Sequence, residues 1–257
     1  MTVSTTPTAP ELEDVVYPES DGQPLGETGF HVKALFLLHQ FLMDLLAGRT
    51  DVYIGVDLFL YYERGNPRAV KAPDVMVIFG VGDHERRTFK TWEERAVPAV
   101  IFEISSDETF EEDLHGKREV YQRLGVAEYF LFDPLGDCLD PRLQGFRLEN
   151  GQFIALVPEA DGGLTSAQLG VRLVPDGFLL RLIDPHTGQP LPTSGEKTAR
   201  LRQETERLQR ALAERARERQ EKERERQEKE REQHRNAELA AEVARLRALL
   251  DQQGRTE

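Results

Sequence analysis

The pattern of hydrophobic and polar residues along the first half of the chain predicts one helix followed by strands. The segment FHVKALFLLHQFLMDLLAG repeats apolar residues at helical spacing, which predicts a buried helix that ends at Gly48. DVYIGVDLFLYYE alternates as a strand does, and PDVMVIF begins with the proline that suits a strand start. The residues between this strand and Pro98 form a polar insert that we predict to be flexible.

The centre of the chain reads as a strand, a helix and a second strand. Residues 99–105 are almost continuously apolar, as in a strand buried on both faces, and residues 111–125 form an amphipathic helix. AEYFLFDP is the next strand, so a crossover between parallel strands is expected. A hairpin around Asn150-Gly151 and two short strands in LGVRLVPDGFLLRLIDP complete the body. The predicted fold class is α+β, a mixed β-sheet flanked by helices.

The tail has a different pattern, which predicts one long charged helix. From Glu196 to Gln253 the chain contains no Pro or Gly and consists mainly of Glu, Arg, Gln, Lys, Ala and Leu. Between residues 214 and 235 the seam positions are charged, so this part is expected to be a solvated helix held by Glu/Arg pairs. Two short apolar stripes at heptad spacing flank it, out of register with each other: Leu201, Thr205, Leu208 and Leu212, then Leu239, Val243, Leu246 and Leu250. Pairing of two copies through these ends, and hence a homo-oligomer, stays open.

Composition separates the body from the tail. The chain has 33 Lys+Arg and 46 Asp+Glu, of which the tail carries 17 basic and 15 acidic residues. Residues 1–195 therefore carry 16 basic and 31 acidic residues, a formal net charge of −15. The predicted organisation is therefore a disordered segment 1–16, one acidic domain 17–185, a Gly/Pro-rich linker 186–195 and the charged helix or coiled coil 196–257.

The sequence argues against secretion and against a membrane span. Cys138 is the only cysteine, so neither an intramolecular disulfide nor a zinc-finger spacing is possible. The N-terminus lacks the charged and apolar regions of a signal peptide. Lys33, Asp44 and other polar residues interrupt the most apolar segment. These features predict a cytoplasmic protein without a membrane partner.

Three ionisable residues occupy places that are apolar by pattern. Asp74 opens the strand PDVMVIF, Glu103 lies inside the buried strand 99–105, and Lys117 lies on the inward stripe of the following helix. Buried carboxylates cost several kcal/mol each unless they are paired or bound to a cation. If the two strands are neighbours, Asp74, Glu103 and the main-chain carbonyl of Ile104 offer oxygen ligands for Mg²⁺ or Mn²⁺. A metal-bound water could then act as a nucleophile, assisted by Lys117.

These residues resemble the motif of the PD-(D/E)xK nuclease superfamily, here Pro73-Asp74 followed by Glu103-Ile104-Ser105. Ser105 stands where that motif has lysine. The stretch DLHGKREVYQRLGVAEYFLFDP, together with APDVMVIFG, resembles the Uma-type restriction endonuclease family, in which the lysine has moved to the following helix. The resemblance covers about residues 17–185 and implies a restriction endonuclease-like fold, Lys117 in the lysine's role, and Glu27 as an acidic residue near the metal.

Each of these residues also has a structural interpretation. Glu103 and Lys117 could form an idle ion pair, Asp74 could cap a turn, and Asp113 could be a charge favoured at a helix start. Asp113, Ser105 and Tyr121 are candidates for supporting the metal ligands from outside. His31, His84 and His115 have no partners at metal-ligand spacing and are treated as ordinary.

The preferred functional hypothesis is a metal-dependent endonuclease that hydrolyses nucleic acid, with DNA as the expected partner. The charge of the body opposes it, because a nucleic-acid binder is expected to present a basic surface. The alternative is a catalytically degenerate nuclease fold that serves as a scaffold, with the helical tail mediating oligomerisation or partner binding.

Overall fold

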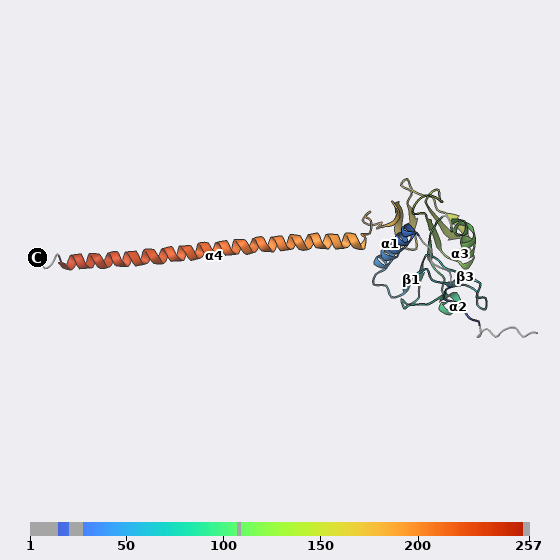
Figure 1. Ribbon diagram of the computed structural model, residues 1–257, viewed down its shortest axis with the longest axis horizontal. Helices are drawn as coiled ribbons and strands as arrows, with labels where there is room; N and C mark the ends of the chain where they lie inside the picture. Colours follow the sequence, from blue (N-terminus) through green and yellow to red (C-terminus); the bar gives the residue numbers. More distant parts are fainter. Residues whose placement is uncertain (1–14, 21–27, 107–108, 254–257) are drawn as a thin grey trace, which may run out of the picture. The chain divides into compact units, whose positions relative to one another are not determined.

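A computed structural model describes residues 15–20, 28–106 and 109–253 (Figure 1). The chain divides into two units, residues 1–194 and residues 195–257. Glu27, and nearly all of the segment predicted to be disordered, lie outside the described residues.

The first unit is built on a mixed six-stranded sheet, as the sequence predicted. Its spatial order is β1 (Val52–Val56), β4 (Val75–Phe79), β6 (Val100–Ile104), β7 (Glu128–Phe132), β8 (Leu143–Glu149) and β9 (Gln152–Ala155). Only β6 and β7 are parallel, and the helical segment between them is the predicted crossover. All other neighbours are antiparallel.

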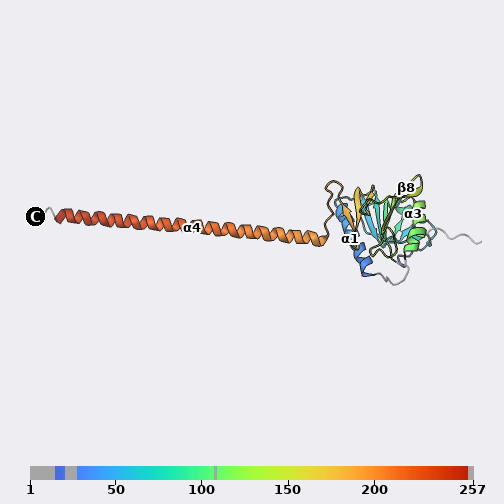
Figure 2. The same ribbon diagram turned by 90° about the horizontal axis from the view of Figure 1, so that it is seen from above.

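Two layers cover the faces of this sheet. Side chains alternate along β6, so Phe102 belongs to one apolar cluster and Ile101 to the other. The first face carries α1 (Gly29–Leu45) and the sheet of β10 (Leu164–Ser166), β11 (Val171–Asp176) and β12 (Leu179–Ile183). The second face carries α3 (Arg118–Leu124) and the small sheet of β3 (Val70–Lys71), β2 (Leu60–Tyr61) and β5 (Phe89–Lys90). Figure 2 shows α1 and α3 on opposite sides of the strands.

Several predicted elements differ from the structure. The strand expected over residues 51–63 is broken into β1 and β2, because Asp57 adopts a left-handed φ of 45° and its N–H donates to the Asp74 carbonyl at 3.1 Å. Helix α1 ends at Leu45, and Gly48, with φ 86°, lies in the turn that follows. The predicted flexible insert contains β5 and the short helix α2 (Thr91–Glu94). Sequence patterns missed these short elements because only tertiary contacts hold them.

The predicted hairpin and late strands are confirmed. Asn150 and Gly151 join β8 to β9 with φ angles of 51° and 80°, the positive values that a two-residue hairpin turn requires. Strands β11 and β12 pair as the two short strands expected after residue 168.

The central helix is a π-helix followed by an α-helix. The π-helical part, η1 (Glu112–Lys117), continues directly into α3, where the sequence predicted one α-helix. A π-turn contains one residue more than an α-turn. Asp113 is therefore turned inward in addition to Lys117, which the sequence had placed on the inward stripe.

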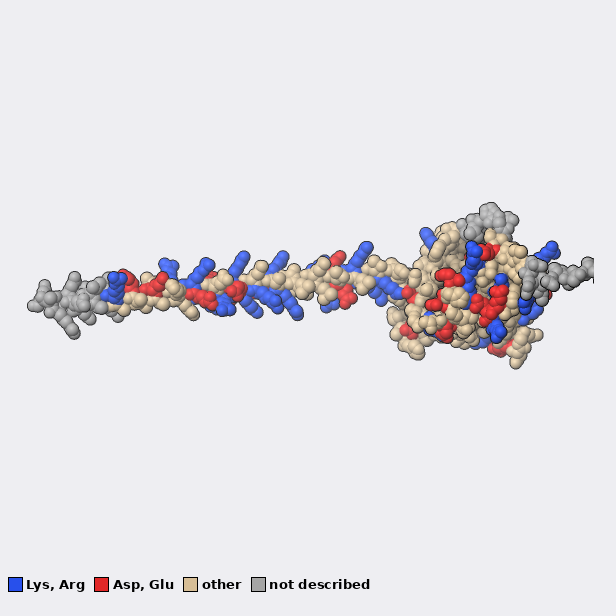
Figure 3. Space-filling view, turned by 90° about the horizontal axis from the view of Figure 1, so that it is seen from below, with Lys and Arg blue, Asp and Glu red and all other residues tan. Residues whose placement is uncertain are grey.

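The second unit is the helix α4 (Ser194–Gln253), which begins two residues before the predicted start. The side chains of residues 198–245 are exposed, including Leu201, Leu208 and Leu212. Basic and acidic side chains alternate along it (Figure 3), and pairs such as Arg226–Glu230 at 3.0 Å match the predicted i,i+4 support. None of the helices in the described part of the chain is both apolar enough and long enough to cross a membrane.

Candidate metal and catalytic site

Asp74 and Glu103 meet because β4 and β6 are antiparallel neighbours. Val75 pairs with Phe102, which places Asp74 and Glu103 one step further along the same ladder. The Ile104 N–H donates to Asp74 Oδ2 at 2.6 Å, and the Asp74 N–H donates to Glu103 Oε2 at 3.4 Å. The expected convergence of the two carboxylates at one end of the sheet is thus present in the structure.

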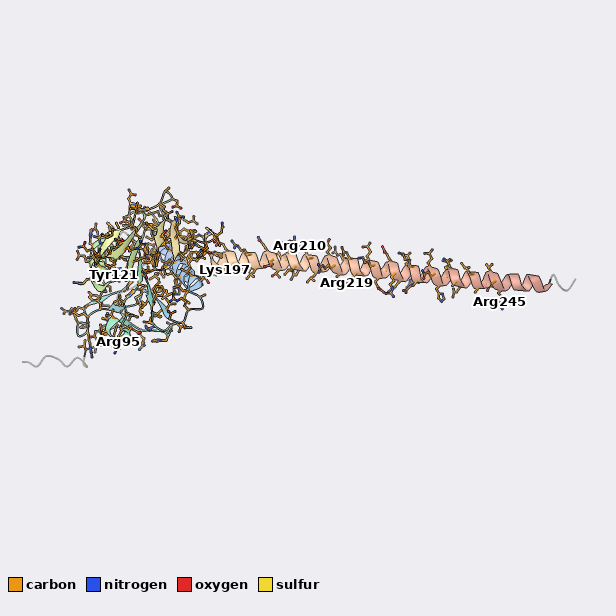
Figure 4. All side chains as sticks on the ribbon, turned by 180° about the vertical axis from the view of Figure 1, so that it is seen from behind. Arg95, Tyr121, Lys197, Arg210, Arg219 and Arg245 are labelled. Carbon is orange, nitrogen blue, oxygen red and sulfur yellow. The ribbon has the colours of Figure 1, made fainter. Side chains whose placement is uncertain are left out.

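Glu103 is buried and held from two sides. Its side chain is 1% exposed, and each carboxylate oxygen accepts a hydrogen bond from the helical crossover. The Tyr121 hydroxyl donates to Oε1 at 2.8 Å, and Lys117 Nζ donates to Oε2 at 2.8 Å. Figure 4 labels Tyr121 among the side chains of the domain. The charge that a buried strand should not carry therefore has two specific partners.

Asp113 shares Lys117 with Glu103. Its Oδ1 lies 2.9 Å from Lys117 Nζ, and its Oδ2 accepts a hydrogen bond from the Ser105 hydroxyl at 3.2 Å. Asp113 is buried, whereas Lys117 is 14% and Asp74 20% exposed. Solvent reaches the cluster through these two residues.

His31 belongs to this neighbourhood, although the sequence analysis treated it as ordinary. It begins the buried stripe of α1, which continues through Ala34, Leu38 and Phe41. Its Nε2 lies 3.7 Å from Asp74 Oδ1, and its side chain is 7% exposed. A polar residue on an apolar helical stripe is the signal that singled out Lys117, and the same rule would have found His31.

Other features of the domain lie away from this cluster. His115 is exposed, and its Nε2 lies 3.8 Å from Oε2 of the equally exposed Glu111, in keeping with its interpretation as an ordinary surface residue. A hollow of 550 Å³ lies between the end of α1 and β1, and none of the site residues lines it.

Comparison with known proteins places this arrangement in a family. The family model of Uma2, described as "Putative restriction endonuclease", matches residues 9–178. The chain belongs to the Uma2 family. A crystal structure of a putative nuclease from Anabaena variabilis is similar to it at 13% identity and a TM-score of 0.43, covering 62% of this chain and 88% of that chain. No curated protein matches the chain.

The Uma2 match includes every site residue described above and excludes α4. Asp74, Glu103 and Lys117 all lie within residues 9–178, and so does His31. The nuclease class of the family implies a nucleic-acid substrate.

The cluster of the Uma2 domain carries an excess of negative charge. The pKa of Glu103 is raised to about 8, chiefly by burial and also by Asp74 and Asp113, although Lys117 acts in the opposite direction. Burial by itself lowers the pKa of Lys117, but Glu103, Asp113 and Asp74 together raise it above its ordinary value. One ammonium therefore faces three carboxylates, and the cluster favours an additional proton or cation.

The donor set fits a small divalent ion. In the described part of the chain, no three His, Cys, Asp or Glu side chains are placed to hold an ion by themselves. Mg²⁺ commonly uses only one or two carboxylates and keeps several waters. A carboxylate oxygen also has lone pairs left after accepting one hydrogen bond. Asp74 and Glu103 can therefore accept a cation while keeping the partners described above.

Proposed function

We propose that this Uma2 protein is a divalent-metal-dependent endonuclease that hydrolyses phosphodiester bonds, with DNA as its substrate. The observation that carries the proposal is the meeting of Asp74, Glu103 and Lys117 at one end of two neighbouring strands. Two carboxylates can hold a metal ion that activates a water molecule, and a lysine can stabilise the charge that develops on a phosphoryl oxygen.

Asp74 and Glu103 would hold Mg²⁺ or Mn²⁺, with the main-chain carbonyl of Ile104 as a further oxygen ligand. Restriction endonuclease-like families generally use divalent metals. When bound, the ion supplies an activated water and neutralises charge on the phosphate. Glu27 remains a candidate ligand on the resemblance alone, since it lies outside the described residues.

The other residues of the cluster position these groups. Tyr121 fixes one oxygen of Glu103, and Lys117 fixes the other. Asp113, held by Ser105, keeps the Lys117 ammonium charged and oriented. Lys117 is partly exposed, so its ammonium can also meet a phosphoryl oxygen or orient a water at the open side of the cluster.

His31 would position Asp74. Its ring lies 3.7 Å from the Asp74 oxygen that does not accept the Ile104 N–H. The imidazole and the Ile104 N–H therefore restrict the carboxylate from opposite oxygens. A carboxylate that is restricted in this way loses less conformational freedom when it binds an ion.

One observation favours the alternative function, a scaffold with a degenerate nuclease fold. Glu103 is almost completely buried and already paired with Lys117, which is the arrangement expected of an idle ion pair. The exposed helix α4 would then be the functional part, by pairing with a second copy or another partner.

Cleavage assays distinguish the two functions. The full chain is incubated with single-stranded, double-stranded and branched DNA in Mg²⁺ or Mn²⁺, beside Asp74→Asn, Glu103→Gln and Lys117→Met. The nuclease proposal expects metal-dependent cutting by the native chain and loss of cutting in all three variants. Circular dichroism and thermal unfolding of each variant control for loss of the fold.

The scaffold function is supported if the native chain cuts none of these substrates and isothermal titration calorimetry detects no Mn²⁺ binding. Cutting that persists in all three variants with chelator present would indicate a contaminating nuclease and contradict the site.

A further inference from the structure

Most basic side chains of the Uma2 domain are neutralised by neighbouring carboxylates. Nine of the sixteen Lys and Arg in residues 1–195 form ion pairs, for example Arg49 with Asp51 and Arg86 with Glu94. On the face shown in Figure 3, acidic and basic side chains lie next to each other over the domain. These paired cations contribute little positive potential to the surface.

The cations without a carboxylate partner are concentrated on two elements. Within the described residues, seven have no acidic group at ion-pair distance, and one of these, Arg142, donates to main-chain carbonyls. Four of the seven lie on the β2–β3 turn or on α3: Arg64, Arg68, Arg118 and Arg123. We call these four residues the hairpin–helix surface. Arg64, Arg68 and Arg123 are exposed.

A hollow separates the turn from the helix. It has a volume of 430 Å³, and its lining includes Arg68 and Asn66 from the turn and Arg123 and Leu124 from the end of α3. One carboxylate, Glu63, also lines it and accepts a hydrogen bond from Asn66 Nδ2 at 3.0 Å. The hollow thus presents two unpaired guanidinium groups against one carboxylate that is tied to the turn.

The turn that carries Arg64 and Arg68 is held in place by hydrogen bonds. The Arg68 N–H donates to Asn66 Oδ1 at 3.1 Å, and the Ala69 N–H donates to the Asn66 carbonyl at 3.1 Å. The Gly65 N–H donates to the Tyr17 hydroxyl at 2.6 Å. A ligand that binds here therefore meets a preformed surface, which reduces the entropy lost on binding.

Both elements lead from the hairpin–helix surface to the cluster. Strand β3 ends three residues before Asp74, and its Lys71 pairs with Glu112 of η1 at 2.6 Å. Arg118 follows Lys117 directly at the start of α3. The arginines without a carboxylate partner therefore lie on the same two segments of the chain as Asp74 and Lys117.

We propose that the hairpin–helix surface binds the phosphodiester backbone of the nucleic acid and leads it to the Asp74–Glu103–Lys117 cluster. This inference rests on the proposed function. Guanidinium groups suit phosphate because they can donate two parallel hydrogen bonds to it. Residues 1–195 as a whole carry a net charge of −15 and repel a polyanion, so we expect binding to be confined to the place where arginines without a carboxylate partner gather.

Binding without chemistry tests this surface separately from cleavage. Fluorescence anisotropy with labelled duplex DNA, single-stranded DNA and duplex RNA of equal length is measured on the full chain in EDTA, over a series of salt concentrations. The test variant is Arg68→Glu/Arg123→Glu. The matched control is Lys33→Glu/Arg95→Glu, which changes the net charge by the same amount. Lys33 and Arg95 also have no carboxylate partner among the described residues, but they lie away from the β2–β3 turn and α3.

The proposal expects the dissociation constant of the test variant to rise at least tenfold for the preferred nucleic acid, and that of the control to change less than twofold. The slope of log K against log salt should fall by about 2 in the test variant, close to the loss of two phosphate contacts. The proposal is overturned if the dissociation constant rises equally in both variants, if it changes in neither, or if the native chain binds none of the nucleic acids. Binding that depends on Arg68 and Arg123 without cleavage in any metal would retain this surface and reject the nuclease function.

Discussion

Lys117 Nζ lies 2.8 Å from Glu103 Oε2, although the two residues come from the end of a π-helix and the end of a central strand. The same ammonium lies 2.9 Å from Asp113 Oδ1. One lysine therefore compensates two buried carboxylates, and Asp74 adds a third carboxylate to the same cluster. Because the cluster has too little positive charge, the same residues should affect both the free energy of unfolding and the proposed affinity for a metal ion.

Replacing Lys117 should destabilise the domain unless Glu103 is changed with it. Lys117→Met leaves two buried carboxylates without their cation, which costs about 3 to 5 kcal/mol in the free energy of unfolding. Glu103→Gln/Lys117→Met should recover a large part of this loss, because one of the two buried charges is gone. Urea unfolding of the two single variants and the double variant measures the coupling. Strictly additive effects would show that the two side chains do not interact.

Removing the Tyr121 hydroxyl should weaken the domain more than removing a similar hydroxyl nearby. Tyr121→Phe removes a donor to a buried carboxylate and should cost about 1.5 to 3 kcal/mol. The control is Tyr129→Phe, because the Tyr129 hydroxyl donates to the neutral main-chain carbonyl of Asp113 at 2.9 Å and should cost about 0.5 to 1.5 kcal/mol. Urea unfolding compares them, and an equal or reversed order would contradict the role of Tyr121.

Two substitutions of Asp74 separate its structural and metal-binding roles. Asp74→Asn keeps an oxygen that can accept the Ile104 N–H but removes a negative charge from a crowded cluster. Its free energy of unfolding without metal should equal or exceed that of the native chain, whereas Mn²⁺ affinity should fall at least about tenfold. Asp74→Ala loses both features and should also be less stable. Calorimetric titration with Mn²⁺ gives the affinity, and unchanged affinity in Asp74→Asn would remove Asp74 from the metal site.

Asp133 should make stability depend on pH in the acidic range. Burial by itself raises its pKa, but the N–H groups of Cys138, Gly136 and Leu139 outweigh burial and hold the pKa below its ordinary value of 3.8. The folded state therefore keeps the carboxylate ionised where the unfolded chain begins to bind a proton. Its stabilisation is complete above the unfolded pKa and is lost as pH falls through the folded pKa.

Asp133→Asn tests this dependence. At about pH 6 the variant should be less stable than the native chain by about 1 to 3 kcal/mol, and the difference should shrink toward about pH 3. Urea unfolding at several pH values measures the difference. A difference that is constant with pH would mean that the substitution acts through packing and not through the charge.

The exposed leucines near the start of α4 should control self-association if the helix pairs with a second copy. Leu201, Leu208 and Leu212 are 64%, 58% and 65% exposed. Replacing all three by Ser should lower the molecular mass measured by sedimentation equilibrium from that of an oligomer to that of a monomer. Replacing the exposed charged residues Arg207 and Arg210 by Gln serves as a control. A native chain that sediments as a monomer at all concentrations would reject pairing through α4.

The chain pattern by itself determined the existence and type of the long elements. Apolar periodicity identified α1, the central strands β4, β6 and β7, the β8–β9 hairpin and the charged helix α4. It also singled out Asp74, Glu103 and Lys117, because a charged residue at an apolar position stands out against its neighbours. These features depend on residues close in sequence, which is the information that periodicity carries.

Only the tertiary structure decided which residues complete the cluster. His31 comes from a helix 43 positions before Asp74, and Asp113 turns inward because the crossover begins as a π-helix. The short strands β2, β3 and β5 likewise form through contacts between distant segments. Antiparallel register between β4 and β6 brings Asp74 to Glu103, and pairing across a sheet is set by the whole fold and not by local sequence.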